Sequence, residues 1–118
     1  MNLAELFRHA SDLHPLPAGQ TLFREGEPGD LMYVLMSGSA EISVRGRVVE
    51  LAEVGAILGE MAMIDDVPRS ATVTARNDCA LLAIERQRFN FLIQQTPNFA
   101  LHVMKVMADR LRRTDAIL

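Results

Sequence analysis

The sequence predicts a small, mainly β domain, an antiparallel sandwich or barrel with helices at both ends of the chain. Between Gln20 and Glu85, short runs of β-branched and aliphatic residues alternate with glycine-centred turns. Such regular spacing of short strands is typical of antiparallel sandwiches and small barrels. Outside this region, apolar residues recur at helical spacing. A chain of 118 residues is long enough for one domain and too short for two ordinary ones.

The N-terminal helix is expected within residues 1–14. Asn2 can cap it, and Leu3, Leu6 and Phe7 follow at helical spacing. Proline disfavours helix in the residue before it, so the pair His14-Pro15 is expected to end the helix.

The β region is expected at residues 18–85. Turns centred on glycine separate its runs of apolar residues. The expected strands are 21–24, 31–36, 40–45, 47–52, 70–75 and 80–85.

Helical patterns return in residues 86–118. A first helix is expected to end near Gln95, and Thr96-Pro97 is a start signal for a second helix that reaches about Leu118. The first half of this second helix is apolar on more than one face, through Phe99, Leu101, Val103, Met104, Val106 and Met107. One stripe can pack on the β region and another needs a partner, so we expect a homodimer through this helix. The alternative is that the β region covers both stripes.

Composition excludes several classes of protein. The net charge of −3 argues against direct nucleic-acid binding, and no apolar run approaches the ~20 residues of a membrane span. The one cysteine, Cys79, can form no internal disulfide, and a charged N-terminus does not resemble a signal peptide. These observations predict a cytoplasmic protein without a membrane span.

One stretch combines glycine, carboxylate and arginine in a pattern that suits a phosphate-containing ligand. Gly59 follows an expected strand and precedes a short helical turn, whose first N–H groups lack partners. After a loop comes Arg69, whose planar guanidinium suits two phosphate oxygens and stays charged when desolvated. Ser70 adds a hydroxyl and a backbone N–H on the same side.

Glu60 lies beside this expected anion site, where it would repel a bare phosphate. A 3′,5′-cyclic nucleotide resolves the conflict, because its ring phosphate carries one charge and its ribose 2′-hydroxyl remains free. A carboxylate accepts a hydrogen bond from that hydroxyl and discriminates against deoxyribose, which lacks it.

Residues 59–64 and 68–73, Gly-Glu-Met-Ala-Met-Ile and Pro-Arg-Ser-Ala-Thr-Val, resemble the phosphate-binding cassette of the cyclic-nucleotide-binding domain family. Catabolite activator proteins, protein kinase A regulatory subunits and cyclic-nucleotide-gated channels are members. Residues 19–38 are similar to the family's opening hairpin. The resemblance implies a jelly-roll-like, eight-stranded antiparallel β-roll (a double-stranded β-helix) in one domain, residues 1–118. Its cassette would span 58–73, between an N-terminal helix and a long C-terminal helix.

The resemblance also implies roles for single residues. Glu60 would accept the ribose hydroxyl, and Arg69 would pair with the cyclic phosphate. Arg110 falls where related channel domains place a purine-capping arginine, and Thr114 falls near a base-contacting hydroxyl of the activators. The remaining implied ligand-binding residues are Leu58 and Gly59 in the pocket wall and Met61, Ala62, Ser70 and Ala71, which would offer backbone N–H groups.

The resulting expectation is a regulatory module that binds cAMP or cGMP and signals through its C-terminal helix to an unknown effector protein. No catalytic residue, metal site or cofactor is expected. The alternatives are a related sensor that has lost nucleotide binding and serves as a dimerisation module, a haem sensor using His14, and a cupin-like enzyme. At the level of single residues, Glu60 and Arg69 could form a surface ion pair, and Arg110 could lie on a solvated helix face.

Overall fold

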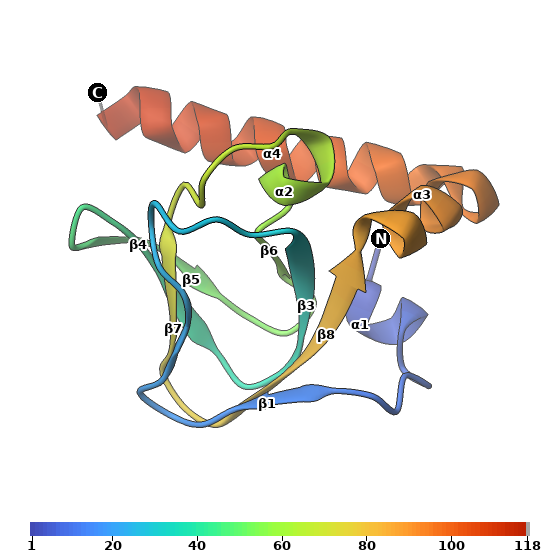
Figure 1. Cartoon of the computed structure of the whole chain (residues 1–118), viewed down its shortest axis with the longest axis horizontal. Helices are drawn as coiled ribbons and strands as arrows, with labels where there is room; N and C mark the ends of the chain where they lie inside the picture. Colours follow the sequence, from blue (N-terminus) through green and yellow to red (C-terminus); the bar gives the residue numbers. More distant parts are fainter. Residues whose placement is uncertain (118) are drawn as a thin grey trace.

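The computed structural model describes the backbone of residues 1–117 and the side chains of residues 1–113. Within them, eight antiparallel strands form two four-stranded sheets, with helices at both ends of the chain (Figure 1). The elements are α1 (Leu3–Leu6), β1 (His14–Leu16), β2 (Thr21–Phe23), β3 (Leu31–Ser37), β4 (Ala40–Val44), β5 (Arg47–Ala52), β6 (Ile57–Leu58), α2 (Met61–Ile64), β7 (Thr72–Ala75), β8 (Cys79–Glu85), α3 (Arg86–Gln95) and α4 (Pro97–Ile117).

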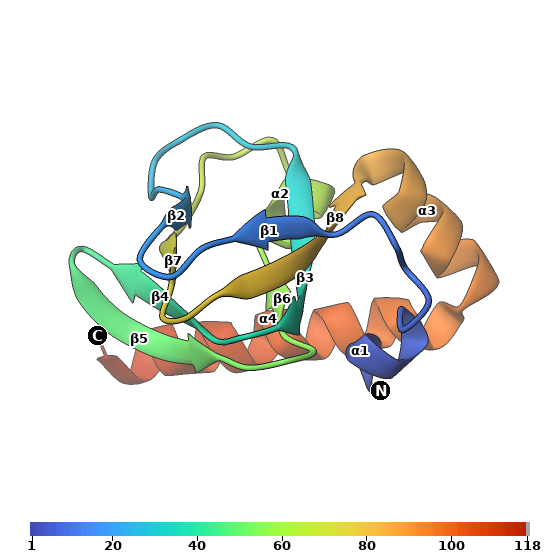
Figure 2. The same ribbon diagram turned by 90° about the horizontal axis from the view of Figure 1, so that it is seen from below.

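The two sheets have the strand orders β1-β8-β3-β6 and β2-β7-β4-β5. Their inward side chains form one apolar cluster between the sheets, around residues such as Leu35, Val73 and Leu81. A second cluster lies between the first sheet and the helices, and Phe99 of α4 is fully buried in it. Helix α4 runs along the length of the roll, and its C-terminal half passes beside β5 (Figure 2). The predicted β-roll with flanking helices is therefore confirmed.

Two strands and one helix differ from the sequence-based expectation. Strands β1 and β6 were not expected from the residues, because one contains a proline and the other has only two residues. Pro15 is tolerated because β1 is an edge strand that pairs only with β8. Asn2 caps α1 by accepting a hydrogen bond from Glu5 N at 3.1 Å, but this helix ends at Leu6.

The C-terminal helices agree with expectation, with α3 ending at Gln95 and α4 beginning at Pro97. Leu101, Met104 and Leu111 of α4 remain 62%, 55% and 64% exposed. The alternative in which the β region covers both apolar stripes of this helix is therefore wrong. No described helix is long and apolar enough to cross a membrane.

Candidate functional site

The cassette predicted from the sequence forms one wall of a cavity between the roll and α4. Gly59 follows β6 with a φ of +76°, a left-handed conformation that L side chains rarely adopt, and this sharp turn leads into α2. The loop after α2 returns the chain to Arg69, just before β7. Glu60 and Arg69 are buried, with 5% and 9% of their surface exposed, and both line the same cavity.

Arg69 lies in a slot that two glycines leave open. A Cβ on Gly29 would come within 2.2 Å of Arg69 Nε, and a Cβ on Gly59 would come within 2.4 Å of Arg69 Nη1. The guanidinium stacks on the ring of Phe23, with 4.1 Å from Cζ to the ring centroid, and Nη1 donates to Gly59 O at 3.4 Å. From the sequence, Gly59 was expected to leave room for a ligand. In the structure it leaves room for the side chain of Arg69.

No carboxylate of a residue described by the structure pairs with the charge of Arg69. Its Nε is buried and has no hydrogen-bond partner among the described residues, and no ion pair within 4.0 Å involves it. Burial lowers the pKa of this guanidinium, against the opposing effects of Tyr33 and of the carboxylates of Asp30, Glu27 and Glu60. A buried donor without an acceptor costs free energy, and an anionic ligand would satisfy it.

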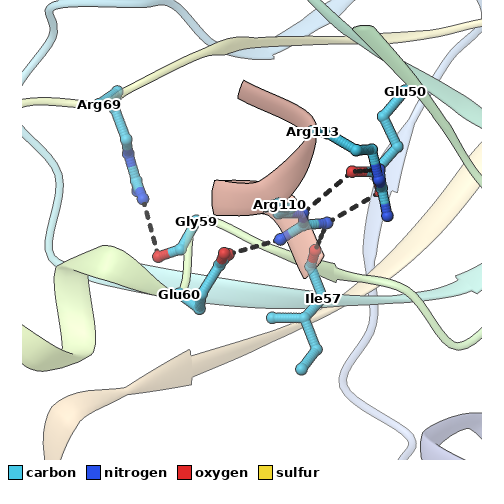
Figure 3. Close-up of polar contacts among 7 residues, drawn as sticks. All are labelled: Glu50, Ile57, Gly59, Glu60, Arg69, Arg110 and Arg113. Atoms are coloured by element: carbon cyan, nitrogen blue, oxygen red, sulfur yellow. Dashed lines mark hydrogen bonds and ion pairs between the residues drawn. The ribbon is translucent and has the colours of Figure 1, made fainter. Parts of the chain in front are cut away.

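Glu60 is paired with α4, not with Arg69. Arg110 Nη1 donates to Glu60 Oε2 at 2.7 Å (Figure 3). The alternative of an ion pair between Glu60 and Arg69 is therefore wrong. The second oxygen of Glu60 makes no hydrogen bond to a described residue, so it remains able to accept one from a ligand.

Arg110 is held by several polar contacts, so the alternative of a solvated helix face is also wrong. Its Nε and Nη2 donate to Glu50 Oε1 and Oε2 at 3.0 and 3.1 Å, and Nη2 donates to Ile57 O at 2.6 Å (Figure 3). Burial alone would lower the pKa of Arg110, but the hydrogen bond to Glu50 and the charge and hydrogen bond of Glu60 outweigh burial and raise the pKa.

Glu50 is a site residue that the sequence did not reveal. Arg113 also donates to it, from Nη1 to Oε1 at 2.7 Å. Burial alone would raise the pKa of Glu50, but the hydrogen bonds and charges of Arg110 and Arg113 lower it. In the sequence, Glu50 is a carboxylate within an ordinary strand pattern. A side chain exposed on the surface would give the same pattern, so the sequence did not mark Glu50 as part of the site.

Two adjoining cavities make up the site. The one beside Glu60 and Arg69 has a volume of about 60 Å³, and its neighbour, between the β4–β5 hairpin and α4, has about 600 Å³. Of the residues that the structure describes, four line both cavities: Ile42, Ser70, Ala71 and Arg110. Arg110 therefore lies at the junction of the two.

The other predicted ligand-binding residues also line the smaller cavity. These are Leu58, Gly59, Met61, Ala62, Ser70 and Ala71. The N–H of Ala62 already donates to Gly59 O, at a long 3.3 Å. The side chain of Thr114 lies outside the described residues. Among the described residues, no group of three or more potential metal ligands comes together.

Comparison with known proteins places this geometry in a family. The sequence profile described as "Cyclic nucleotide-binding domain" matches residues 13–96. A CRP-like cAMP-activated global transcriptional regulator of Mycobacterium tuberculosis is 34% identical over 104 residues, covering 84% of this chain and 46% of the relative. A cyclic nucleotide-gated potassium channel of Mesorhizobium japonicum is 38% identical over 108 residues, covering 92% of this chain and 30% of the channel.

Solved structures agree with the sequence matches. The catabolite activator protein of Thermus thermophilus superimposes with a TM-score of 0.80 at 30% identity, covering 95% of this chain and 55% of that protein. The chain spans less than half the length of the curated relatives described above. The profile match extends over both sheets and the cassette that holds Glu60 and Arg69. This chain therefore belongs to the cyclic nucleotide-binding domain family.

Proposed function

We propose that this chain is a sensor module that binds cAMP or cGMP and acts through binding, without catalysing a reaction. One observation carries the proposal: the buried Arg69 has a donor without a partner and lines the same cavity as the buried carboxylate of Glu60. The guanidinium suits the singly charged ring phosphate, and the carboxylate suits the ribose 2′-hydroxyl.

The remaining residues of the cassette complete this assignment. Backbone N–H groups of Met61, Ala62, Ser70 and Ala71 assist Arg69 in holding the phosphate, and Leu58 and Gly59 form the wall beneath the ribose. The base occupies the larger cavity next to Arg110, with Thr114 as a second candidate for a base contact. The volumes support placing the base in the larger cavity. Ligand pockets usually measure about 300–1,000 Å³, and of the two cavities only the larger, at about 600 Å³, reaches that range.

Ligand binding requires the side chain of Arg110 to move. The cavity of about 60 Å³ beside Glu60 and Arg69 is too small for a ribose and its cyclic phosphate. Arg110 closes it from the side of α4 through the contact with Glu60. A nucleotide that reaches Glu60 therefore changes the position of α4, and this displacement is the signal that an effector protein reads.

The exposed face of α4 supports a homodimer. Leu101, Met104, Ala108 and Leu111 follow one another at spacings of three, four and three residues, which is the a/d pattern of a two-helix seam. Leu101, Met104 and Leu111 are more than half exposed in the single chain. We place the protein in the cytoplasm, where its unpaired Cys79 would stay reduced.

Titration calorimetry of the purified chain against cAMP, cGMP and 5′-AMP tests the proposal. At least one cyclic nucleotide should bind, and 5′-AMP should bind far more weakly because its phosphate carries an additional charge and is not tied to the ribose. Failure of both cyclic nucleotides to bind would refute the sensor assignment.

Replacing Arg69 by alanine should remove most of the affinity. A buried phosphate left without its charged partner costs about 2–5 kcal/mol, which is a loss of roughly 30-fold or more. The matched control is Arg76→Ala, an arginine whose side chain is 44% exposed beside Glu41. Calorimetry should show wild-type affinity for the control, and equal affinities of the two variants would contradict the role of Arg69.

A further inference from the structure

Glu50 occupies a position where a strand of this roll would ordinarily carry an apolar residue. It lies on β5 opposite Ile42 of β4, and Ile42 is buried with its side chain in the wall of both cavities. Two residues further along each strand, Ala40 and Ala52 form the next inward-facing pair, and both are buried. Glu50 thus points toward the interior, and only 17% of its side chain is exposed.

An irregularity in the β4–β5 pairing lies next to Glu50. Ile42 pairs with Glu50 but Ser43 pairs with Val48, so Val49 is an additional residue on β5. Such bulges bend a strand and redirect the side chains beside them. A carboxylate turned inward costs free energy unless it is paired, and the residues that pair with Glu50 both come from α4.

The contacts show what Glu50 does to Arg110. Both carboxylate oxygens receive the Nε and Nη2 edge of the guanidinium, at 3.0 and 3.1 Å. This two-point contact fixes the plane of the guanidinium as well as its position. The remaining nitrogen, Nη1, is thereby directed at Glu60 Oε2, 2.7 Å away (Figure 3).

We propose that Glu50 is a positioning residue for the nucleotide site, which orients Arg110 at the junction of the two cavities and holds the C-terminal half of α4 on β5. The inference rests on the proposed nucleotide binding, and Glu50, which also lines the larger cavity, acts in it through Arg110. When Glu60 exchanges Arg110 for a ribose hydroxyl, the two-point contact with Glu50 keeps the guanidinium beside the base instead of releasing it to solvent.

The test combines Glu50→Gln, Arg110→Gln and the double variant. Glu50→Gln keeps the shape of the side chain and removes its charge and one acceptor. Affinity for the cyclic nucleotide that the wild type binds more tightly should fall roughly 3- to 30-fold in Glu50→Gln, which lies within the range found for residues coupled in one network. The double variant should bind no more weakly than Arg110→Gln alone, because the effect of Glu50 passes through Arg110.

The matched control is Glu41→Gln. Glu41 lies on the outer face of the same sheet, 43% exposed, with an arginine within 4.0 Å, so it shares the chemistry of Glu50 without the inward position. The affinity of the Glu41→Gln variant for the cyclic nucleotide should equal that of the wild type. Wild-type affinity in Glu50→Gln overturns the proposal, as does a double variant in which the two single losses multiply.

Hydrogen exchange of the ligand-free protein separates this inference from the proposed function. In Glu50→Gln, the amides in the C-terminal half of α4 should exchange faster than in the wild type, and those of α3 should not change. If the wild type binds no cyclic nucleotide, the proposed function fails and the exchange comparison still decides whether Glu50 holds α4. Unchanged exchange in α4 overturns the positioning role.

Discussion

The guanidinium of Arg69 is placed by residues that carry no charge. Gly29 and Gly59 leave room on two sides, and the ring of Phe23 supports a third. The conformation of Gly59, with φ at +76°, also requires glycine for the backbone. Gly29 has no such backbone requirement, so its role is to provide space alone.

Gly29→Ala should therefore weaken nucleotide binding without straining the backbone. The new Cβ would lie 2.2 Å from Arg69 Nε, which forces the guanidinium out of its slot. We expect a loss of roughly tenfold or more, equivalent to about 1.4 kcal/mol, measured by calorimetry. In an Arg69→Ala background the same substitution should have little effect. A comparable loss in both backgrounds would show that Gly29 acts by another route.

At the level of elements, α4 is attached to the roll in two chemically different ways. Its N-terminal half is anchored by apolar packing, with Phe99 and Val103 buried. Its C-terminal half is held by Arg110 and Arg113 on Glu50 and Glu60. Apolar packing does not depend on the ligand, whereas one of the ionic contacts, that of Arg110 with Glu60, involves the carboxylate proposed to bind ribose. The C-terminal half is therefore the part that a ligand can move.

Phe99→Ala should destabilise the whole domain. The ring contacts Phe7, the residue after α1, and Phe89 of α3 edge-on, with centroids 6.5 and 5.7 Å away, and so joins the N-terminal segment, α3 and α4. Removing a fully buried phenylalanine costs about 3–5 kcal/mol of unfolding free energy. Phe91→Ala on α3 is the control, because that ring is 59% exposed and its loss should change stability by less than about 0.5 kcal/mol. Urea denaturation of both variants measures the difference.

The attachment of α4 through Glu50 should depend on pH in the acid range. The pKa of Glu50 in the folded protein lies below its ordinary value of 4.5. Its stabilising contribution is therefore fully present above that value and is lost as pH falls through the folded pKa. The difference in unfolding free energy between wild type and Glu50→Gln should be constant near neutral pH and shrink below pH 4.5. A difference that persists unchanged to pH 3 would argue against a charged Glu50 in the folded state.

For the molecule as a whole, the ligand site and the exposed seam of α4 share one helix. Arg110 and Leu111 are adjacent in sequence, yet one contacts the roll and the other is 64% exposed. A shift of α4 on nucleotide binding would therefore also move the surface offered to a second copy. The fold thus connects the cavity to the proposed dimer without an additional element.

Charge introduced into the seam should disrupt the dimer. Met104→Glu places a carboxylate in a face that two copies would bury, so sedimentation velocity should show a shift from dimer to monomer. Lys105→Ala, one residue away and not in the seam, should leave the dimer intact. A wild type that remains monomeric at high micromolar concentration would refute dimerisation through this helix.

Features that depend on neighbouring residues were predictable from the amino-acid sequence. The capping Asn2, the boundary between α3 and α4 at Thr96-Pro97, and the cassette from Gly59 to Arg69 all follow from local chemistry, and the cassette identified the family. Residue pattern alone did not find β1 and β6, since Pro15 interrupts the first and the second has only two residues.

Which charges pair with one another could be seen only in the folded chain. Glu60 pairs with Arg110, 50 residues later, and not with Arg69 in its own cassette, and Glu50 reaches the same arginine across 60 residues. Folding brings α4 against β5, and a contact between segments distant in sequence leaves no periodic pattern in either one. The same is true of the Arg69 slot, where the space left by Gly29 becomes meaningful only once the guanidinium lies against it.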